Sequence, residues 1–267
     1  MVKTIKRYEG SKKQQVIEII FDACKRRGIF EFDNEFVKQV TGGVKFANQF
    51  DATKVDHSAK LPVKVREARY FILHLGQGRH AFVKGIDDGY HTFEAINEKD
   101  RIDWRYRKSV LNEADTSESN VLAVAANQRI IHDFLYEDIV AEPKIYFARR
   151  TKCSFRFSVG ALKYEAENIQ MEIDLTFEYR GNITVLEAKN GFPKDFAVYQ
   201  LYNPYRTFIE SRKAGLKGIE QVSCCYVLRS KTGGNSVLRL YEYTFKKPHD
   251  LASIAFKKAA EYRLVRR

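Results

Sequence analysis

The chain contains Glu172-Ile-Asp-Leu-Thr-Phe-Glu-Tyr-Arg-Gly-Asn-Ile-Thr-Val-Leu-Glu-Ala-Lys189, in which two runs rich in β-branched and aromatic residues flank Arg180-Gly181-Asn182. Such runs around a short turn sequence predict a β-hairpin. Successive side chains of a strand point to opposite faces, so one face of this hairpin is apolar enough to pack on helices. The residues of that face are Ile173, Leu175, Phe177, Leu186 and Ala188.

The opposite face of the predicted hairpin gathers two carboxylates and a lysine. If residues 180–181 form a two-residue turn, Asp174 pairs with Glu187, and Lys189 lies on the same face. A turn at residues 181–182 would instead place Asp174 opposite Lys189 and keep all three on one face. A three-residue loop would separate them, so the arrangement depends on the turn.

Adjacent carboxylates on a sheet repel each other unless a cation lies between them. Asp174 and Glu187 offer oxygen ligands suited to Mg2+, and the main-chain carbonyl of Ala188 can add a third. Lys189 can then stabilise an attacking hydroxide and the charge that develops at phosphorus. This set predicts metal-assisted hydrolysis of a phosphodiester, with a solvated charged hairpin as the structural alternative.

At this point the sequence resembles the PD-(D/E)XK nuclease superfamily, and within it the type II restriction endonucleases, over about residues 120–230. The resemblance rests on Asp174, the short hairpin and Glu187-Ala188-Lys189. It implies that Asp174 and Glu187 bind Mg2+ and that Lys189 activates water. It also implies a core of helix, strands, helix and strand, whose second helix directs a residue such as Gln200 toward the site.

The predicted order of elements after residue 120 agrees with that core. Apolar spacing and β-branched runs predict helices and strands over the following ranges. They are a helix at 120–136, strands at 145–148, 155–159, 169–179 and 183–188, a helix at 195–213, strands at 222–228 and 238–245, and a helix at 251–262. We therefore predict an α/β (α+β) fold with a restriction-endonuclease-like mixed sheet in a nuclease domain at 120–267.

The N-terminal part predicts a separate domain. Helices are expected at 11–27, capped by Ser11 and ended by Gly28, at 33–42, and at 44–51. A hairpin is expected from residues 70–75 and 80–84. Helices followed by a hairpin resemble a winged helix-turn-helix, so we predict a DNA-binding domain at 1–111 and a polar linker at 112–119.

Several polar residues are candidates for DNA contact, although each is also an ordinary surface residue. They are Lys45, Asn48, Gln49 and Lys54 on and after the third helix, Arg79 at the hairpin tip, Arg149, Arg150 and Lys152 beside the first strand of the nuclease core, and Gln200. Trp104 can stack on a base but is more often a packed anchor in a sequence of this kind.

Composition limits the remaining possibilities. The 267 residues carry a net charge of +12, which favours a polyanionic partner such as double-stranded DNA. The sequence shows neither the roughly 18 to 20 apolar residues of a spanning helix nor a secretory signal, and no nucleotide-binding loop. Four cysteines without a Cys-x-x-Cys pair favour reduced thiols, so we expect a cytoplasmic protein with no membrane contact and no nucleotide cofactor.

Three hypotheses follow from these residues. The first is a Mg2+-dependent type II restriction endonuclease that cuts double-stranded DNA at a specific sequence, as a homodimer because two strands need two sites. The second is a repair or recombination nuclease that recognises DNA structure. The third is a winged-helix DNA-binding regulator with an inactive nuclease-like domain.

Overall fold

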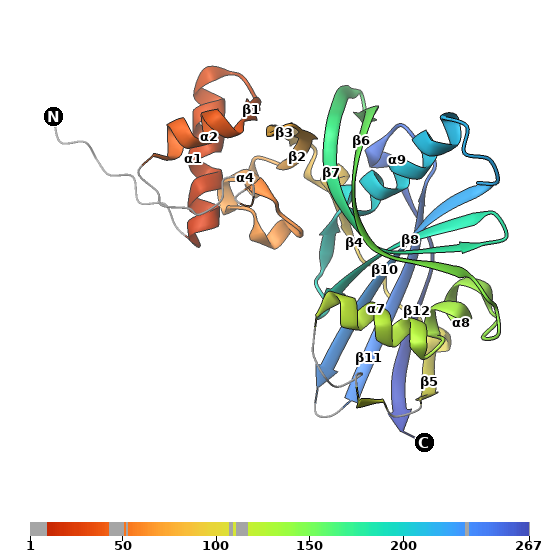
Figure 1. Cartoon of the computed structure of the whole chain (residues 1–267). Coiled ribbons are helices and arrows are strands. Elements are labelled where there is room, and N and C mark those ends of the chain that lie inside the picture. The colour runs from red at the N-terminus through yellow and green to blue at the C-terminus, as the bar shows by residue number, and fades with distance from the viewer. Residues whose placement is uncertain are drawn as a thin grey trace. The chain divides into compact units, whose positions relative to one another are not determined.

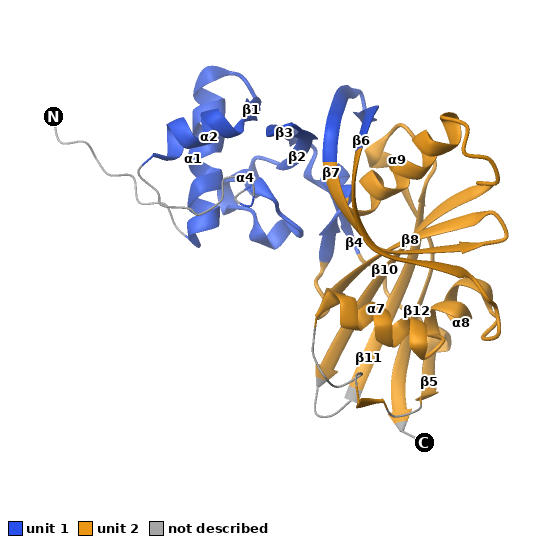
Figure 2. Ribbon diagram, in the orientation of Figure 1, with its two compact units in different colours: residues 1–92, 153–169, 195–199 blue, residues 93–152, 170–194, 200–267 orange. Residues whose placement is uncertain are grey.

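The computed structural model describes residues 10–42, 51, 53–106, 109–110, 117–232 and 235–266. The chain divides into two compact units (Figure 2). Unit 1 comprises residues 1–92, 153–169 and 195–199, and unit 2 comprises residues 93–152, 170–194 and 200–267.

Two capped helices begin unit 1. α1 (Lys12–Arg27) starts at a capping box formed by Ser11 and Gln14 and ends at Gly28, whose φ of 67° is left-handed. α2 (Asn34–Thr41) is capped by Asp33, which accepts the Phe36 N–H at 2.7 Å. The predicted bounds of both helices are confirmed. The sequence could predict them because each capping residue interacts with residues close to it in the chain. The predicted third helix at 44–51 has its residues 44–50, with Lys45, Asn48 and Gln49, outside the described residues.

The Ser11 cap predicts a measurable contribution to stability. Ser11 Oγ accepts the Gln14 N–H at 3.3 Å, and Gln14 Oε1 accepts the Ser11 N–H at 2.9 Å. We expect Ser11→Ala to lower the free energy of unfolding by about 1 kcal/mol in urea titrations. Ser11→Asp retains a capping oxygen and should stay close to wild type. Equal losses in both variants would contradict a capping role.

A small antiparallel sheet completes the core of unit 1. β2 (Tyr70–Gly76) and β3 (Arg79–Lys84) form the predicted hairpin, and β1 (Glu31–Asp33) adds a third strand in the order β1-β3-β2. Unit 1 also contains η1 (Ser58–Lys60), α4 (Val63–Glu67), α5 (Ile86–Gly89), β4 (Tyr90–Thr92) and β9 (Asp195–Ala197). β4 and β9 pair antiparallel. The winged-helix interpretation remains a prediction.

Unit 2 is built on a mixed sheet of seven strands in the order β5-β12-β11-β10-β8-β7-β6 (Figure 1). The strands are β5 (Arg101–Tyr106), β6 (Lys144–Val159), β7 (Leu162–Tyr179), β8 (Asn182–Asn190), β10 (Gln221–Thr232), β11 (Asn235–Phe245) and β12 (Ile254–Arg266). The end of β6 and the start of β7, within residues 153–169, belong to unit 1. β8 pairs parallel with β10, and β12 with β5, whereas the β7–β8, β10–β11 and β11–β12 pairs are antiparallel. The predicted α+β class with a mixed sheet is therefore confirmed.

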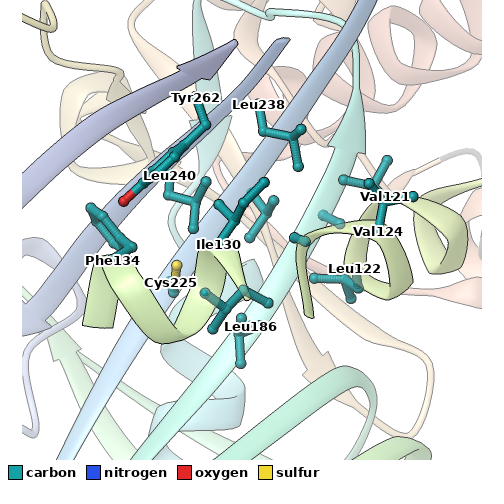
Figure 3. Packing of buried hydrophobic residues seen from close by; sticks show 14 of the residues in the cluster. Val121, Leu122, Val124, Ile130, Phe134, Leu186, Cys225, Leu238, Leu240 and Tyr262 are labelled. Atoms are coloured by element: carbon teal, nitrogen blue, oxygen red, sulfur yellow. The ribbon is translucent and has the colours of Figure 1, made fainter. Parts of the chain in front are cut away.

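Helices α7 (Glu118–Asn127) and α8 (Ile130–Tyr136) cover one face of this sheet, as Figure 3 shows in close-up. Their apolar side chains pack on Leu186, Cys225 and Leu240, which come from three different strands. α9 (Tyr199–Lys213) contacts the opposite face, where Leu201 O accepts from Cys224 Sγ and Gln200 accepts from Tyr226. The remaining short elements are η2 (Glu98–Asp100) and η3 (Leu251–Ser253).

The structure corrects six predicted elements. The helix expected at 120–136 is two helices, because Arg129 adopts a left-handed φ of 61° between them. The separate strands at 145–148 and 155–159 are one strand, and β7 starts seven residues before the expected 169. The helix expected at 195–213 starts at Tyr199, after β9. The helix expected at 251–262 is η3 followed by β12.

β5 lies within the predicted N-terminal domain at 1–111, but the structure places it in unit 2. It pairs with β12, from Arg101 opposite Glu261 to Tyr106 opposite Arg266, and so belongs to unit 2. Trp104 on this strand donates from Nε1 to Gln128 O at 2.9 Å and packs edge-on against Tyr262. These contacts make Trp104 an anchor between β5 and the helical layer. No helix in the described part of the chain is long and apolar enough to cross a membrane.

Candidate active site

The β7–β8 turn sets the geometry of the site in unit 2. Arg180 and Gly181 have φ values of 49° and 77°, and Tyr179 pairs with Asn182. This is the two-residue turn that the sequence offered as its first alternative. The pairing continues to Leu175 opposite Leu186. Asp174 is the next residue of β7, so the register brings it beside the Glu187-Ala188-Lys189 end of β8.

Asp174 contacts β8 through its side chain. Its Oδ2 accepts the N–H of Ala188 at 3.3 Å. The N–H and C=O of one strand residue point toward the same neighbour, so the carbonyl of Ala188 faces the side on which Asp174 lies. The methyl group of Ala188 is fully buried in the helical layer of the core.

Glu187 is the centre of a hydrogen-bonded cluster. Its Oε1 accepts from Lys189 Nζ at 2.9 Å and from Gln200 Nε2 at 3.0 Å. Tyr226, which pairs with Glu187 in the β8–β10 register, donates its hydroxyl to Gln200 Oε1 at 3.3 Å. The structure thus brings together four predicted site residues, Asp174, Glu187, Lys189 and Gln200, and adds Tyr226.

Glu118 is a further carboxylate that the sequence analysis missed. Its Oε1 lies 2.8 Å from Lys189 Nζ, and it is the first residue of α7. The polar sequence around residue 118 predicts a linker at that position. The signal that identifies it is Ser117, a capping residue whose side chain accepts the Asn120 N–H at 3.1 Å and starts the helix at 118.

Burial shifts the protonation of both carboxylates on the hairpin. Burial raises the pKa of Glu187 to about 8, with the charge of Asp174 adding to the rise and Lys189 opposing it. Burial also raises the pKa of Asp174, against the lowering effects of Lys189 and of the Ala188 N–H. For Lys189, burial alone would lower the pKa, but the carboxylates of Glu187 and Glu118 raise it above its ordinary value. The positive charge of Lys189 therefore offsets only part of the free-energy cost of ionising the two buried carboxyl groups.

The donor set of this cluster fits a small divalent cation. Two carboxylates with raised pKa values and a main-chain carbonyl on the same side are oxygen ligands of the kind Mg2+ takes. A cation at these oxygens would favour their ionised forms. Within the described residues, no group of three or more His, Cys, Asp or Glu side chains could hold a metal ion. The predicted set contains only two such side chains, so it relies on the main chain.

The other candidates for DNA contact lie at the surface. Arg149 is exposed beside the Phe208 ring, with its guanidinium carbon 5.4 Å from the ring centroid. Arg150 is exposed and lies 3.7 Å from Glu172, and Lys152 is also exposed. In unit 1, Lys54 is exposed, whereas Arg79 lies 3.7 Å from the carboxylates of both Glu31 and Glu167.

Fold and cluster together define an α+β protein with a carboxylate–lysine site at the end of a hairpin in a mixed sheet. The chain belongs to the family described as Domain of unknown function (DUF6997), whose model matches residues 85–263. A second model, Domain of unknown function (DUF6996), matches residues 14–82. No curated protein and no solved structure is significantly similar to the chain. The cluster of Asp174, Glu187, Lys189, Gln200 and Glu118 falls within the DUF6997 match.

Proposed function

We propose that the protein is a type II restriction endonuclease that hydrolyses phosphodiester bonds of double-stranded DNA at a specific sequence with Mg2+. The observation that carries the proposal is the convergence of Asp174, Glu187 and Lys189 at one end of the β7–β8 hairpin, with both carboxyl pKa values raised. A solvated charged hairpin would leave these side chains in water with ordinary pKa values.

Each residue of the cluster has a role in this proposal. Asp174, Glu187 and the Ala188 carbonyl would hold Mg2+, which supplies Lewis-acid stabilisation of charge on the phosphoryl oxygens. Lys189 Nζ orients a nucleophilic water and balances the negative charge that develops during attack. Gln200 fixes the orientation of the Glu187 carboxylate, and Tyr226 in turn fixes Gln200.

The charge of the chain supports a DNA substrate. A net charge of +12 attracts a polyanion and accelerates its encounter with the protein. Exposed Arg149, Arg150 and Lys152 on β6 offer contacts to phosphates near the core that carries the site. We further propose that unit 1 grips the duplex in the manner of a winged helix and that two chains form a symmetric homodimer.

Incubation of unmethylated phage DNA with the purified protein tests this proposal. We expect discrete fragments on agarose gels in Mg2+ and intact DNA in EDTA. The Glu187→Ala variant should leave the DNA intact in both conditions, because it removes a metal ligand from the centre of the cluster. Circular dichroism checks that the variant is folded.

The other outcomes distinguish the remaining hypotheses. A Mg2+-dependent smear would indicate a structure-specific repair or recombination nuclease. Intact DNA with a metal-independent mobility shift would indicate a DNA-binding regulator and would overturn the enzymatic proposal.

A further inference from the structure

A cavity of about 350 Å3 in unit 1 is lined by residues from the end of α1, from β1 and from the start of α2. This volume is at the lower end of the range of about 300–1,000 Å3 that small-molecule sites have, so it suits one small group. The lining residues that matter here are Arg27, Glu31, Phe32, Asp33, Phe36 and Arg79.

Aromatic and guanidinium planes line this cavity. The Phe32 and Phe36 rings lie 6.2 Å apart at an angle of 53°, and the Arg27 guanidinium carbon lies 4.7 Å from the centroid of Phe36. Phe32 is buried and Phe36 is partly exposed. Flat aromatic groups bind such surfaces by stacking, and guanidinium planes add cation–π attraction.

The charges of the lining cancel. The lining contains two arginines, Arg27 and Arg79, and two carboxylates, Glu31 and Asp33, and Arg79 lies 3.7 Å from Glu31. The remaining titratable residue of the lining, His80, is neutral at physiological pH because burial lowers its pKa to about 4. A site with both hydrogen-bond donors and acceptors but no net charge selects a neutral polar heterocycle over a phosphate group.

The helix end beside the cavity is basic. α1 ends with Lys25, Arg26 and Arg27, which are all exposed. A second cavity shares Arg27, Asp33 and Phe36 with the first and is also lined by Glu35, Lys38 and Gln39, so the basic residues beside the first cavity are those of the α1 end. Phosphates attached to a heterocycle would therefore meet cations outside the cavity. Ile29 on the rim is 61% exposed, and exposed apolar side chains of this kind insert between base steps in proteins that distort DNA.

We propose that this cavity receives a nucleobase turned out of the DNA duplex. The inference deepens the proposed function, because it rests on the chain binding DNA. The base stacks on the Arg27 guanidinium plane, which itself lies over Phe36, its donors meet Glu31 and Asp33, and its acceptors meet Arg79. The flanking phosphates bind the basic end of α1. Unit 1 then contributes recognition of an unpaired nucleotide in addition to a grip on the duplex.

Binding of a bulged duplex tests the proposal without knowledge of a cleavage sequence. Fluorescence anisotropy in EDTA compares a paired duplex with duplexes that carry one unpaired A, C, G or T, and with one that carries an abasic bulge. We expect at least one base-bearing bulge to bind about tenfold more tightly than the paired duplex, and the abasic bulge to bind like the paired one.

Two variants of equal charge locate the effect. Arg27→Ala removes the stacking plane and should abolish the preference for the bulged base. Arg26→Ala removes the same charge from the same exposed helix end, but Arg26 does not line the cavity. This variant should therefore bind the paired and the bulged duplex more weakly by the same factor and keep the preference for the bulged base. Glu31→Gln, at another exposed position, should change which base is preferred.

Three results would overturn the proposal: equal binding of all duplexes by the wild type, an abasic bulge that binds as tightly as a base, or identical ratios in the two arginine variants. Cleavage of phage DNA is measured separately. A protein that cuts DNA without a bulge preference would refute this inference alone, and one that shows the preference without cutting would refute the proposed nuclease alone.

Discussion

We expect Lys189→Met to cleave DNA about 10²–10⁴ times more slowly than the wild type. Lys189 Nζ lies 2.9 Å from Glu187 and 2.8 Å from Glu118, and its side chain is only 21% exposed. Methionine has a similar length but no charge, so the buried carboxylates lose their compensating cation. The substitution also removes the amine that is proposed to orient the nucleophilic water and to stabilise the negative charge of the transition state.

Single-turnover cleavage rates and DNA affinity measure this effect separately. The affinity for DNA should change little, because one partly buried charge contributes little to the attraction of a polyanion by a chain of net charge +12. Lys217→Met is the matched control, since Lys217 is an exposed lysine between α9 and β10. Cleavage by Lys189→Met within twofold of wild type would exclude a role for the amine in the reaction.

The parts of the fold that follow from the sequence are those fixed by local chemistry. Ser11 and Gly28 bound α1 because a hydroxyl caps free N–H groups and glycine adopts left-handed φ. Arg180-Gly181 supports a two-residue turn, and the alternation of side chains then dictates that Asp174 and Glu187 share a face. The candidate site was predictable because it lies on one short-range hairpin.

The parts that could not be predicted depend on distant partners. β12 contains Lys-Lys-Ala-Ala-Glu, whose residues favour helices, but it lies between β11 and β5 and buries Ala260, Tyr262 and Leu264 at every second position. Tertiary pairing therefore overrides local propensity. Glu118 was missed for a related reason, since only the packing of α7 on the sheet brings that residue to Lys189.

We also expect Glu187→Gln to make the metal-free protein more stable than the wild type, with a difference that grows from pH 5 to pH 8. Glutamine keeps the Oε1 that accepts from Lys189 and Gln200 but cannot ionise. In the wild type, burial raises the pKa of Glu187 from its ordinary 4.5 to about 8. Below pH 4.5 the carboxyl is protonated in both folded and unfolded states and has no effect on stability.

Between pH 4.5 and pH 8 the unfolded chain ionises Glu187 while the folded chain retains the proton, so the free energy of unfolding falls as pH rises. Each pKa unit corresponds to about 1.4 kcal/mol, so the loss at pH 8 amounts to a few kcal/mol. The raised pKa of Asp174 acts in the same direction. The raised pKa of Lys189 stabilises the folded chain by a constant amount throughout this window, and its contribution varies with pH only above the ordinary value of 10.5.

Thermal unfolding in EDTA at several pH values measures the difference, with Glu98→Gln as the control at an exposed carboxylate. If the melting temperatures of wild type and Glu187→Gln change equally with pH, Glu187 does not have a raised pKa in the folded protein.

Mg2+ adds a second criterion at pH 8, because a cation that binds only the folded site stabilises the folded protein by mass action. Wild type should regain stability in Mg2+ while Glu187→Gln gains less. Such a result would show that the cluster gives up stability in order to bind a cation, which is the reason to expect buried carboxylates at an active site and not in an ordinary sheet.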